Sequence, residues 1–322
     1  MKRQMRIFFV APKGDARGTG SLRDPVATLG RAIEAAREPG AAHGSRIILR
    51  GGNYFDVSVE LTAADSGLTI EAAAGETPVL LGGRPIRGWK RDGNGFYAAA
   101  LPGVKEGTWD FRSLIVDGRY VARARYPREG KLTHLSRFKV RWMSTTKGGW
   151  ERKPTKRELT TMRIEPGQLP RSVDPANLEL TVYHSWDESV VGVHSIDHRT
   201  GRVVFSTTAG HPPGAFCGWK EQCCQYVAWN IREGLTDPGQ WYLDRTRGCV
   251  VYWPLKGEKM DRLLVVAPTT ERVIRLEGTE KAAIRDVALR GLTTSATTTP
   301  LEAGGFGALK FDGAISGVFT RD

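Results

Sequence analysis

Ile47-Ile-Leu-Arg-Gly51 is an apolar run of strand length that stops at a glycine, and four other segments repeat this pattern. They are Val79-Leu-Leu-Gly82, Ile274-Arg-Leu-Glu-Gly278, Val287-Ala-Leu-Arg-Gly291 and Leu309-Lys-Phe-Asp-Gly313. The last two are one coil apart, and a repeat of roughly 20–25 residues is typical of a stacked β-solenoid. Each coil of such a fold buries its apolar face only against its neighbours, so both ends need a cap.

The N-terminal segment predicts one of these caps. Phe8-Phe9-Val10 favours a strand, and Asp24-Pro25 has the residue types typical of a helix N-cap and first helical position. Apolar residues then recur at helical spacing, at Val26, Leu29, Ile33 and Ala36. Because Pro39-Gly40 ends the pattern, we expect a short amphipathic helix that covers the open end of the solenoid.

The C-terminal end predicts no equivalent cap. Val318-Phe319-Thr320 favours another coil strand, and the sequence ends at Asp322. An uncovered strand edge promotes aggregation. We therefore expect this chain to be a fragment, or an unusually short form, of a longer protein.

Between residues 101 and 268 the strand–glycine repeat gives way to hairpin patterns. Asp117-Gly118 separates two apolar runs and predicts a two-residue hairpin turn, because such a turn needs positive φ angles. Further strand pairs are predicted at 178–186 with 190–197, then 203–205, and at 240–243 with 249–253. The organisation predicted is 1–100 for the cap and first coils, 101–268 for an inserted antiparallel β domain, and 269–322 for further, incomplete coils.

Charge and hydropathy limit the classes of partner. The 322 residues carry a formal net charge of +12, which favours an acidic partner such as a uronic-acid polymer. The cations are mostly scattered arginines without a recognition motif, so we expect no nucleic-acid partner. No apolar run reaches the ~18–20 residues of a membrane span, and residues 7–11 are too few for the core of an export signal. We expect a monomer that does not bind membranes.

Cysteine spacing gives little support for a metal site. Cys217, Cys223, Cys224 and Cys249 form no C-x-x-C pair. His211 with Cys217 and Cys223 could bind zinc in principle. We predict buried, reduced thiols with no metal and no cofactor, and a disulfide of Cys217 or Cys249 is the alternative in an exported protein.

Two long segments carry a resemblance to a known family. The opening Phe9-Val-Ala-Pro-Lys-Gly-Asp-Ala-Arg-Gly-Thr-Gly-Ser21 resembles that of right-handed parallel β-helix proteins that act on polysaccharides. Leu114-Ile-Val-Asp-Gly-Arg-Tyr-Val-Ala-Arg-Ala-Arg-Tyr-Pro127 and the segment 237–254 resemble β-helix glycoside hydrolases like those of family 141. The β-xylosidases of family 120 are more distantly similar.

The resemblance implies an all-β fold, a right-handed parallel β-helix (a pectate-lyase-like solenoid) with an N-terminal helix cap and an inserted antiparallel β domain. It also implies an extracytoplasmic protein that hydrolyses glycosidic bonds of a plant or microbial polysaccharide or oligosaccharide. In that family the catalytic carboxylates lie on later coils, beyond the end of this sequence.

Glycoside hydrolysis uses two carboxyl groups, one as acid and one as base or nucleophile. Asp312 is the first candidate because it precedes a glycine that closes a coil strand, although a salt bridge between stacked coils is the alternative. Asp187 and Glu188 are the next candidates, at the end of a strand in the insert, where a solvated turn is the alternative.

Four residues are candidates for binding substrate. Arg123 and Arg125 share one face of a strand, followed by Tyr126, and two like charges on one face need an anion between them. That anion is either the substrate or a nearby side chain, Asp110 or Asp117. Trp186 precedes the candidate carboxylates, and flat tryptophan rings pack against sugar rings. Seven of nine tryptophans lie between residues 142 and 253 of the insert; Trp241 and Trp253 have a core pattern, whereas Trp142 and Trp150 lie in polar sequence.

Two other function classes stay open. A Ca²⁺-dependent lyase or epimerase on an acidic glycan would fit the positive charge, but no carboxylate cluster on successive coils supports a Ca²⁺ site. A β-helix fragment that binds a glycan without cleaving it is the third class.

Overall fold

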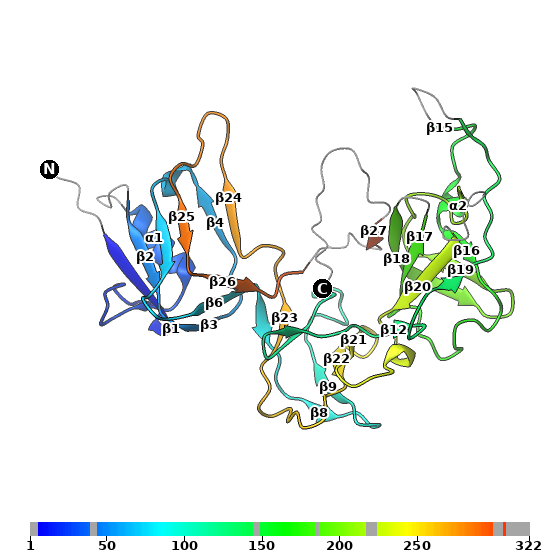
Figure 1. The fold of residues 1–322 in the computed structure, drawn as a ribbon, viewed down its shortest axis with the longest axis horizontal. Helices are drawn as coiled ribbons and strands as arrows, with labels where there is room; N and C mark the ends of the chain where they lie inside the picture. Colours follow the sequence, from blue (N-terminus) through cyan, green and yellow to red (C-terminus); the bar gives the residue numbers. More distant parts are fainter. Residues whose placement is uncertain are drawn as a thin grey trace. The chain divides into compact units, whose positions relative to one another are not determined.

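Figure 1 shows the computed structural model, which describes residues 6–38, 44–143, 149–184, 187–216 and 224–298, together with the backbone of 305–306. These residues are mainly β with few helices, as predicted at that level. The chain forms two compact units. Unit 1 contains 1–86, 111–120 and 264–298, and unit 2 contains 87–110, 121–263 and 299–322.

Three parallel sheets make up most of unit 1. In spatial order the first has β1 (Ile7–Asp15), β2 (Arg46–Leu49), β5 (Thr69–Ala72) and β25 (Ala288–Arg290). The second has β3 (Gly52–Tyr54), β6 (Pro78–Leu81) and β26 (Thr293–Ser295), and the third pairs β4 (Val59–Thr62) with β24 (Ile274–Glu277). Along the chain β2, β3 and β4 belong to the first, second and third sheet, and β5 belongs to the first sheet again. Within the first sheet Arg46 pairs with Thr69, and Thr69 pairs with Ala288.

Four of the five predicted strand–glycine segments form strands, namely β2, β6, β24 and β25. The fifth, at 309–313, lies outside the described residues. The four strands belong to three different sheets: β2 and β25 to the first, β6 to the second and β24 to the third. Their alternate side chains are buried together: Ile47, Leu49 and Ile70 are fully buried in one core cluster.

The helix of unit 1 begins later than predicted. Helix α1 (Leu29–Arg37) has Thr28 as its N-cap, whose hydroxyl accepts a hydrogen bond from the Arg31 amide at 3.2 Å. The prediction of Asp24-Pro25 as N-cap and first turn is wrong. Asp24 instead accepts a hydrogen bond from the Thr19 amide at 2.8 Å, which keeps this segment in a turn. Leu29 and Ile33 pack into the core as expected.

The predicted Asp117-Gly118 turn is confirmed. Strands β10 (Ile115–Val116) and β11 (Arg119–Tyr120) pair across it, and both turn residues have positive φ angles of 47° and 78°. The hairpin belongs to unit 1, in an antiparallel sheet with β23 (Val265–Pro268) and β7 (Gly83–Pro85). A 3₁₀ turn at Ala63–Asp65 completes this unit.

Unit 2 is antiparallel. Its largest sheet has the order β12 (Arg125–Tyr126), β20 (Gln225–Trp229), β17 (Glu179–Tyr183), β18 (Glu188–Asp197), β19 (Arg202–Phe205) and β16 (Thr161–Arg163), with β13 (Leu132–Thr133) on β20 and β27 (Gly305–Phe306) on β18. A second sheet contains β21 (Trp241–Asp244), β22 (Cys249–Tyr252), β9 (Tyr97–Ala100) and β8 (Lys90–Arg91). A separate hairpin pairs β14 (Trp142–Met143) with β15 (Gly149–Trp150).

The strand pairs predicted for the insert are confirmed as β17–β18, β18–β19 and β21–β22. Trp241 is fully buried, as its strand pattern indicates, and its indole Nε1 donates to the Val121 carbonyl at 3.1 Å. Short helix α2 (Lys156–Leu159) and a 3₁₀ turn at Arg232–Gly234 link strands of this unit.

Candidate functional site

Asp187 lies at the turn between β17 and β18, where its carbonyl accepts a hydrogen bond from the His184 amide at 2.9 Å. Its side chain is only 3% exposed, and Oδ2 lies 3.2 Å from Nε2 of His211. The other carboxylate oxygen, Oδ1, is buried and has no hydrogen-bond partner in the described part of the chain. A buried carboxylate with one unused oxygen is costly unless something pairs with it, so this oxygen is the strongest sign of a ligand in the molecule.

His184 lies close to Asp187, and His134 lies close to His184. His184 is buried, and its Nε2 lies 2.9 Å from Oγ of Ser189, which also accepts the Gly210 amide at 3.1 Å. Burial lowers the pKa of His184 to about 4, against the opposing effect of Asp187 and with a contribution from His211. Burial likewise lowers the pKa of His134 to about 3, helped by His184 and Arg137. Both imidazoles are therefore neutral at pH 7.

Glu188 does not share the position of Asp187. In β18 the buried side chains alternate with half-buried ones, and Ser189 and Val191 belong to the buried set, whereas Glu188 and Val190 are half-buried. Successive residues of a strand point to opposite faces. Glu188 therefore lies on the less buried face of β18, whereas Asp187 precedes the strand and belongs to the turn.

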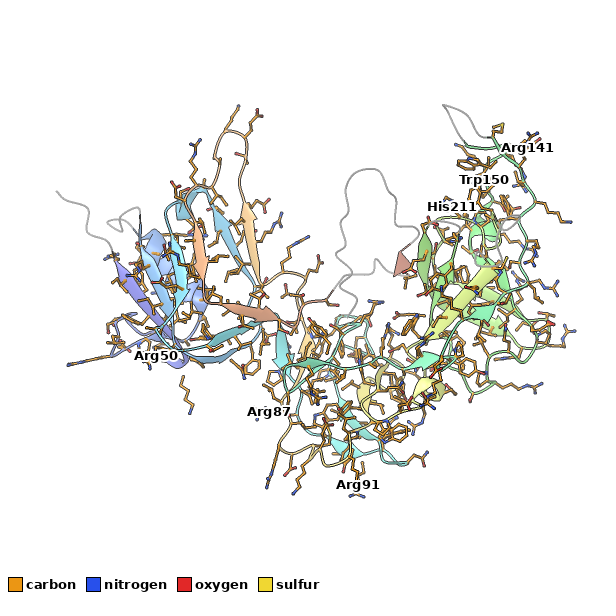
Figure 2. The ribbon with its side chains drawn as sticks, viewed as in Figure 1. Arg50, Arg87, Arg91, Arg141, Trp150 and His211 are labelled. Atoms are coloured by element: carbon orange, nitrogen blue, oxygen red, sulfur yellow. The ribbon has the colours of Figure 1, made fainter. Side chains whose placement is uncertain are left out.

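A cluster of aromatic rings adjoins His211. The ring centroid of Trp150 lies 4.5 Å from that of Phe216, 4.8 Å from that of Trp142 and 5.0 Å from that of Phe138. Phe216 is in turn 5.6 Å from the His211 ring, so the cluster is continuous with the Asp187–His211 pair. Figure 2 places Trp150 and His211 near each other in unit 2. Trp142 keeps 38% of its surface exposed.

The three residues of the Arg123 region occupy a different place. Arg123 forms a two-pronged ion pair with Glu179, at 2.8 and 2.9 Å, and both side chains are almost buried. Arg245 also pairs with Glu179 and reaches Asp110 at 3.0 Å. The anion that faces Arg123 is therefore Glu179, which the sequence reasoning did not consider.

Arg125 and Tyr126 are also engaged within the unit. The Arg125 guanidinium lies 5.3 Å from the centroid of Trp229 and donates to the Gly130 carbonyl. Half-buried Tyr126 packs against the core of the large sheet. In the sheet register Arg125 shares a row with Glu179, whereas Glu188 is opposite Tyr183, four residues or about 13 Å further along the strand direction. Glu188 also lies on β18, three strands across from β12. The structure does not bring Arg125 and the Asp187 turn together.

Two of the predicted site residues, Asp312 and Trp186, lie outside the described residues. So do Cys217 and Cys223, the proposed partners of His211 in a zinc site; Cys224 and Cys249 are both buried. Among the residues with described positions, no group of three or more His, Cys, Asp and Glu side chains is placed to hold a metal ion. The pairing of Asp187 with His211 had no sequence signal, because it depends on how the β17–β18 turn folds against the segment after β19.

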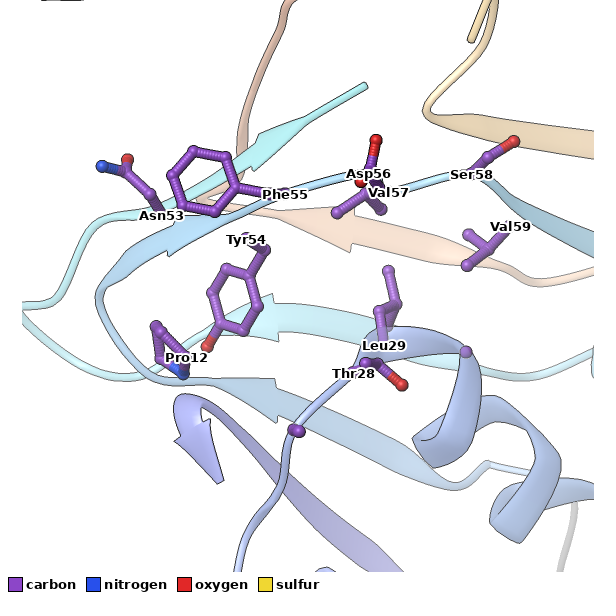
Figure 3. Close-up of a pocket in the computed structure, with 12 residues that line it drawn as sticks. Pro12, Thr28, Leu29, Asn53, Tyr54, Phe55, Asp56, Val57, Ser58 and Val59 are labelled. Carbon is purple, nitrogen blue, oxygen red and sulfur yellow. The ribbon is translucent and has the colours of Figure 1, made fainter. Parts of the chain in front are cut away.

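Unit 1 has a cavity of about 300 Å³ between the start of α1 and the segment from β3 to β4. Figure 3 shows Leu29 and Val57 turned toward each other in it, whereas the oxygens of Asp56 and Ser58 point away from Leu29. Asp56 accepts a hydrogen bond from Thr269 at 2.7 Å and Ser58 one from Thr270 at 3.2 Å. Because Asp56 and Ser58 are engaged with Thr269 and Thr270 and do not converge on a point inside the cavity, the Asp187 region is the better candidate site.

Comparisons with known proteins identify a fold but no family. A solved structure described as "Glycoside hydrolase" matches 91% of this chain with a TM-score of 0.72 and 23% identity. The chain spans about half of that structure, 51%. "The complex structure of XylC with xylose" matches at a TM-score of 0.42 and 14% identity, over 91% of this chain and 36% of that one. No protein-family model and no curated protein matches the sequence.

The fold of the first structure is therefore shared by nearly the whole chain. Within the described residues, no helix has the length and apolar character needed to cross a membrane.

Proposed function

We propose that this chain is part of a carbohydrate-active hydrolase built on a right-handed parallel β-helix, with unit 2 as its inserted antiparallel β domain. The observation that carries the proposal is the fold shared with a solved glycoside hydrolase over 91% of the chain. The cyclic order of parallel strands through three sheets of unit 1 supports the β-helix assignment. The sugar class and the family remain those suggested by the sequence resemblance.

The site we assign to this function is the Asp187–His211 pair with its aromatic cluster. A hydrolase of this kind needs a carboxyl group that exchanges a proton with the glycosidic oxygen and a second carboxylate on the other side of the sugar. Asp187 is our first carboxyl group, because His211 is within reach to hold or accept its proton. The flat faces of Trp142 and Trp150 supply the apolar surface for a sugar ring.

Asp312 is our candidate for the second carboxylate. It follows β27 in the sequence, and β27 pairs with β18 at Val190 and Val191, close to the turn that carries Asp187. Arg123 is not assigned to substrate binding in this proposal, because Glu179 already neutralises its charge.

Release of new reducing ends from a panel of neutral and acidic polysaccharides tests hydrolysis by this chain. Ultraviolet absorbance from unsaturated uronates, measured in parallel with and without Ca²⁺, distinguishes a lyase. We expect reducing ends without that absorbance, a loss of about a hundredfold or more for Asp187→Asn, and nearly full activity for the neighbouring control Glu188→Gln. Equal activity of Asp187→Asn would refute its role. Glycan binding without turnover in the folded chain would instead support a binding module.

A further inference from the structure

The β14–β15 hairpin and the segments beside it carry an unusual combination of exposed aromatic and basic side chains. Trp142 and Met143 are 38% and 49% exposed at the hairpin. Figure 2 shows Arg141 next to Trp150 here, and the Glu151 amide donates to the Arg141 carbonyl across the hairpin at 2.9 Å. We call residues 137–143 and 149–158 the hairpin surface.

The positive charge of the hairpin surface is not balanced internally. Apart from Arg137, which donates to the Ser136 carbonyl and to the Cys224 sulfur, five of its exposed cations form no ion pair with any described residue: Lys139, Arg141, Lys153, Lys156 and Arg157. The two carboxylates of the same segments are Glu151 and Glu158, and Glu158 is already held by Arg152 at 2.7 and 2.8 Å. Some other cations of unit 2 are paired, as Arg232 and Arg247 are with Asp92. Uncompensated cations gathered on one surface favour an anionic ligand.

The aromatic rings beside these cations are held in place. Trp150 is packed between Phe138, Trp142 and Phe216, and edge-on contacts of this kind restrict the ring orientations. Because Trp150 is fixed, the exposed part of Trp142 is presented as a rigid flat surface. A rigid surface loses little conformational entropy when a ligand stacks on it.

We propose that the hairpin surface binds an anionic glycan, a uronic-acid polymer, with its sugar rings on Trp142 and its carboxylates among the five cations. The proposal rests on the proposed function for the ligand being a glycan and adds its charge class. A basic, aromatic surface also suits single-stranded nucleic acid. The fold shared with a glycoside hydrolase favours the glycan.

Affinity electrophoresis or calorimetry with polygalacturonate, a neutral xylan and a single-stranded RNA tests this without any turnover. We expect polygalacturonate to bind at least tenfold more tightly than xylan, and to weaken as ionic strength rises from ~0.01 to ~0.1 M, where the Debye length falls from about 30 to about 10 Å. The triple variant Lys139→Gln, Arg141→Gln and Lys153→Gln should lose roughly tenfold in polygalacturonate affinity. Trp142→Ala should weaken it further.

A matched control removes three exposed, unpaired cations of unit 1: Arg17→Gln, Arg23→Gln and Arg290→Gln. It has the same net charge as the hairpin variant, and we expect it to keep nearly full affinity. Thermal unfolding of both variants checks that each is folded. The proposal is overturned by equal binding of xylan and polygalacturonate, by equal loss in both triple variants, or by preferential binding of RNA. A chain that binds polygalacturonate but releases no reducing ends contradicts only the hydrolase proposal.

Discussion

The two units differ in how they handle charge. In unit 1 most ion pairs are partly exposed: Arg50 pairs with Glu76 at 2.7 Å, with side chains 45% and 32% exposed, and Asp65, which pairs with Arg37, is the buried exception among the described pairs. In unit 2 the central acid, Glu179, is 4% exposed and serves Arg123 and Arg245 from distant parts of the sequence. Each exposed ion pair of unit 1 thus contributes little to the free energy of unfolding. Unit 2 depends on a few buried ion pairs, and water cannot replace a partner that is removed from one of them.

The buried network of unit 2 extends beyond the ion pairs. Asn230 is fully buried with a positive φ of 63°, and its amide donates to the carbonyls of Asn177 and Leu243, each at 2.8 Å. Its side-chain oxygen accepts from the Leu243 amide and from Arg123. Burial opposes the charge of Arg245, but Glu179 and Asp110 outweigh it and raise the pKa of Arg245 above its ordinary value. These hydrogen bonds and ion pairs form one network that connects the two large sheets of unit 2.

The largest expected effect is that of Glu179→Gln. The substitution leaves Arg123 and Arg245 buried without their shared carboxylate, and removal of one partner of a buried pair costs about 3–5 kcal/mol. Urea unfolding followed by tryptophan fluorescence measures the loss, because eight tryptophans lie between residues 101 and 268.

Glu34→Gln is the matched change in unit 1. Glu34 pairs with Arg31 at 3.5 Å on the exposed face of α1, and both side chains are largely accessible. We expect a loss below about 0.5 kcal/mol. If the two substitutions cost the same, the contrast between the units is wrong.

The next effect is a pH dependence that arises from two buried histidines of unit 2. Neutral, buried His134 and His184 resist protonation until about pH 3 and 4, whereas in the unfolded chain they take up protons below about pH 6.5. Stability should therefore fall as pH is lowered from about 6.5 to 4.5, by up to about 1.4 kcal/mol per pH unit for each histidine. Hydrogen bonds from Arg247 and Arg232 keep the pKa of Asp92 below its ordinary value, so its contribution is lost only below about pH 4.

His134→Leu tests this assignment. Neither ring nitrogen of His134 has a hydrogen-bond partner within the described ranges, so the substitution removes a desolvated polar ring rather than an interaction. Urea unfolding at pH 7.0 and 5.0 should show that the variant loses less stability than the parent on acidification. A parent chain whose stability is flat across this pH interval would contradict the burial argument.

The sequence predicted the strands of unit 1 because each circuit repeats the same local pattern. Ile47 and Ile70 are buried by neighbours that obey the same alternation, so a short stretch already contains the relevant information. The start of α1 was misplaced because Asp24 and Thr28 are both good N-caps, and only the hydrogen bond from Thr19 to Asp24 decides between them. Turn chemistry at Asp117-Gly118 was equally local and was predicted correctly.

The candidate site of unit 2 could be predicted only in part. Asp187 was proposed from its place at a strand end, but its partner His211 comes from another segment that tertiary packing brings close. Arg123 was recognised as needing an anion, and yet the sequence offered Asp110 or Asp117 while Glu179 on β17 is the residue opposite it. Side-chain partners across a sheet depend on the order of its strands, which no short pattern encodes.

The smallest effect is one in which the two units should not differ. Gly118 of unit 1 and Gly130 of unit 2 both have positive φ angles, 78° and 69°, and an added Cβ would meet no atom within 4 Å at either position. Substitution by alanine therefore adds only the strain of a left-handed backbone, about 1 kcal/mol at each site. Equal losses in urea unfolding of Gly118→Ala and Gly130→Ala would show that local backbone terms are the same in both units. A much larger loss at Gly130, whose carbonyl accepts from Arg125, would mean that the dependence of unit 2 on long-range contacts extends to its surface turns.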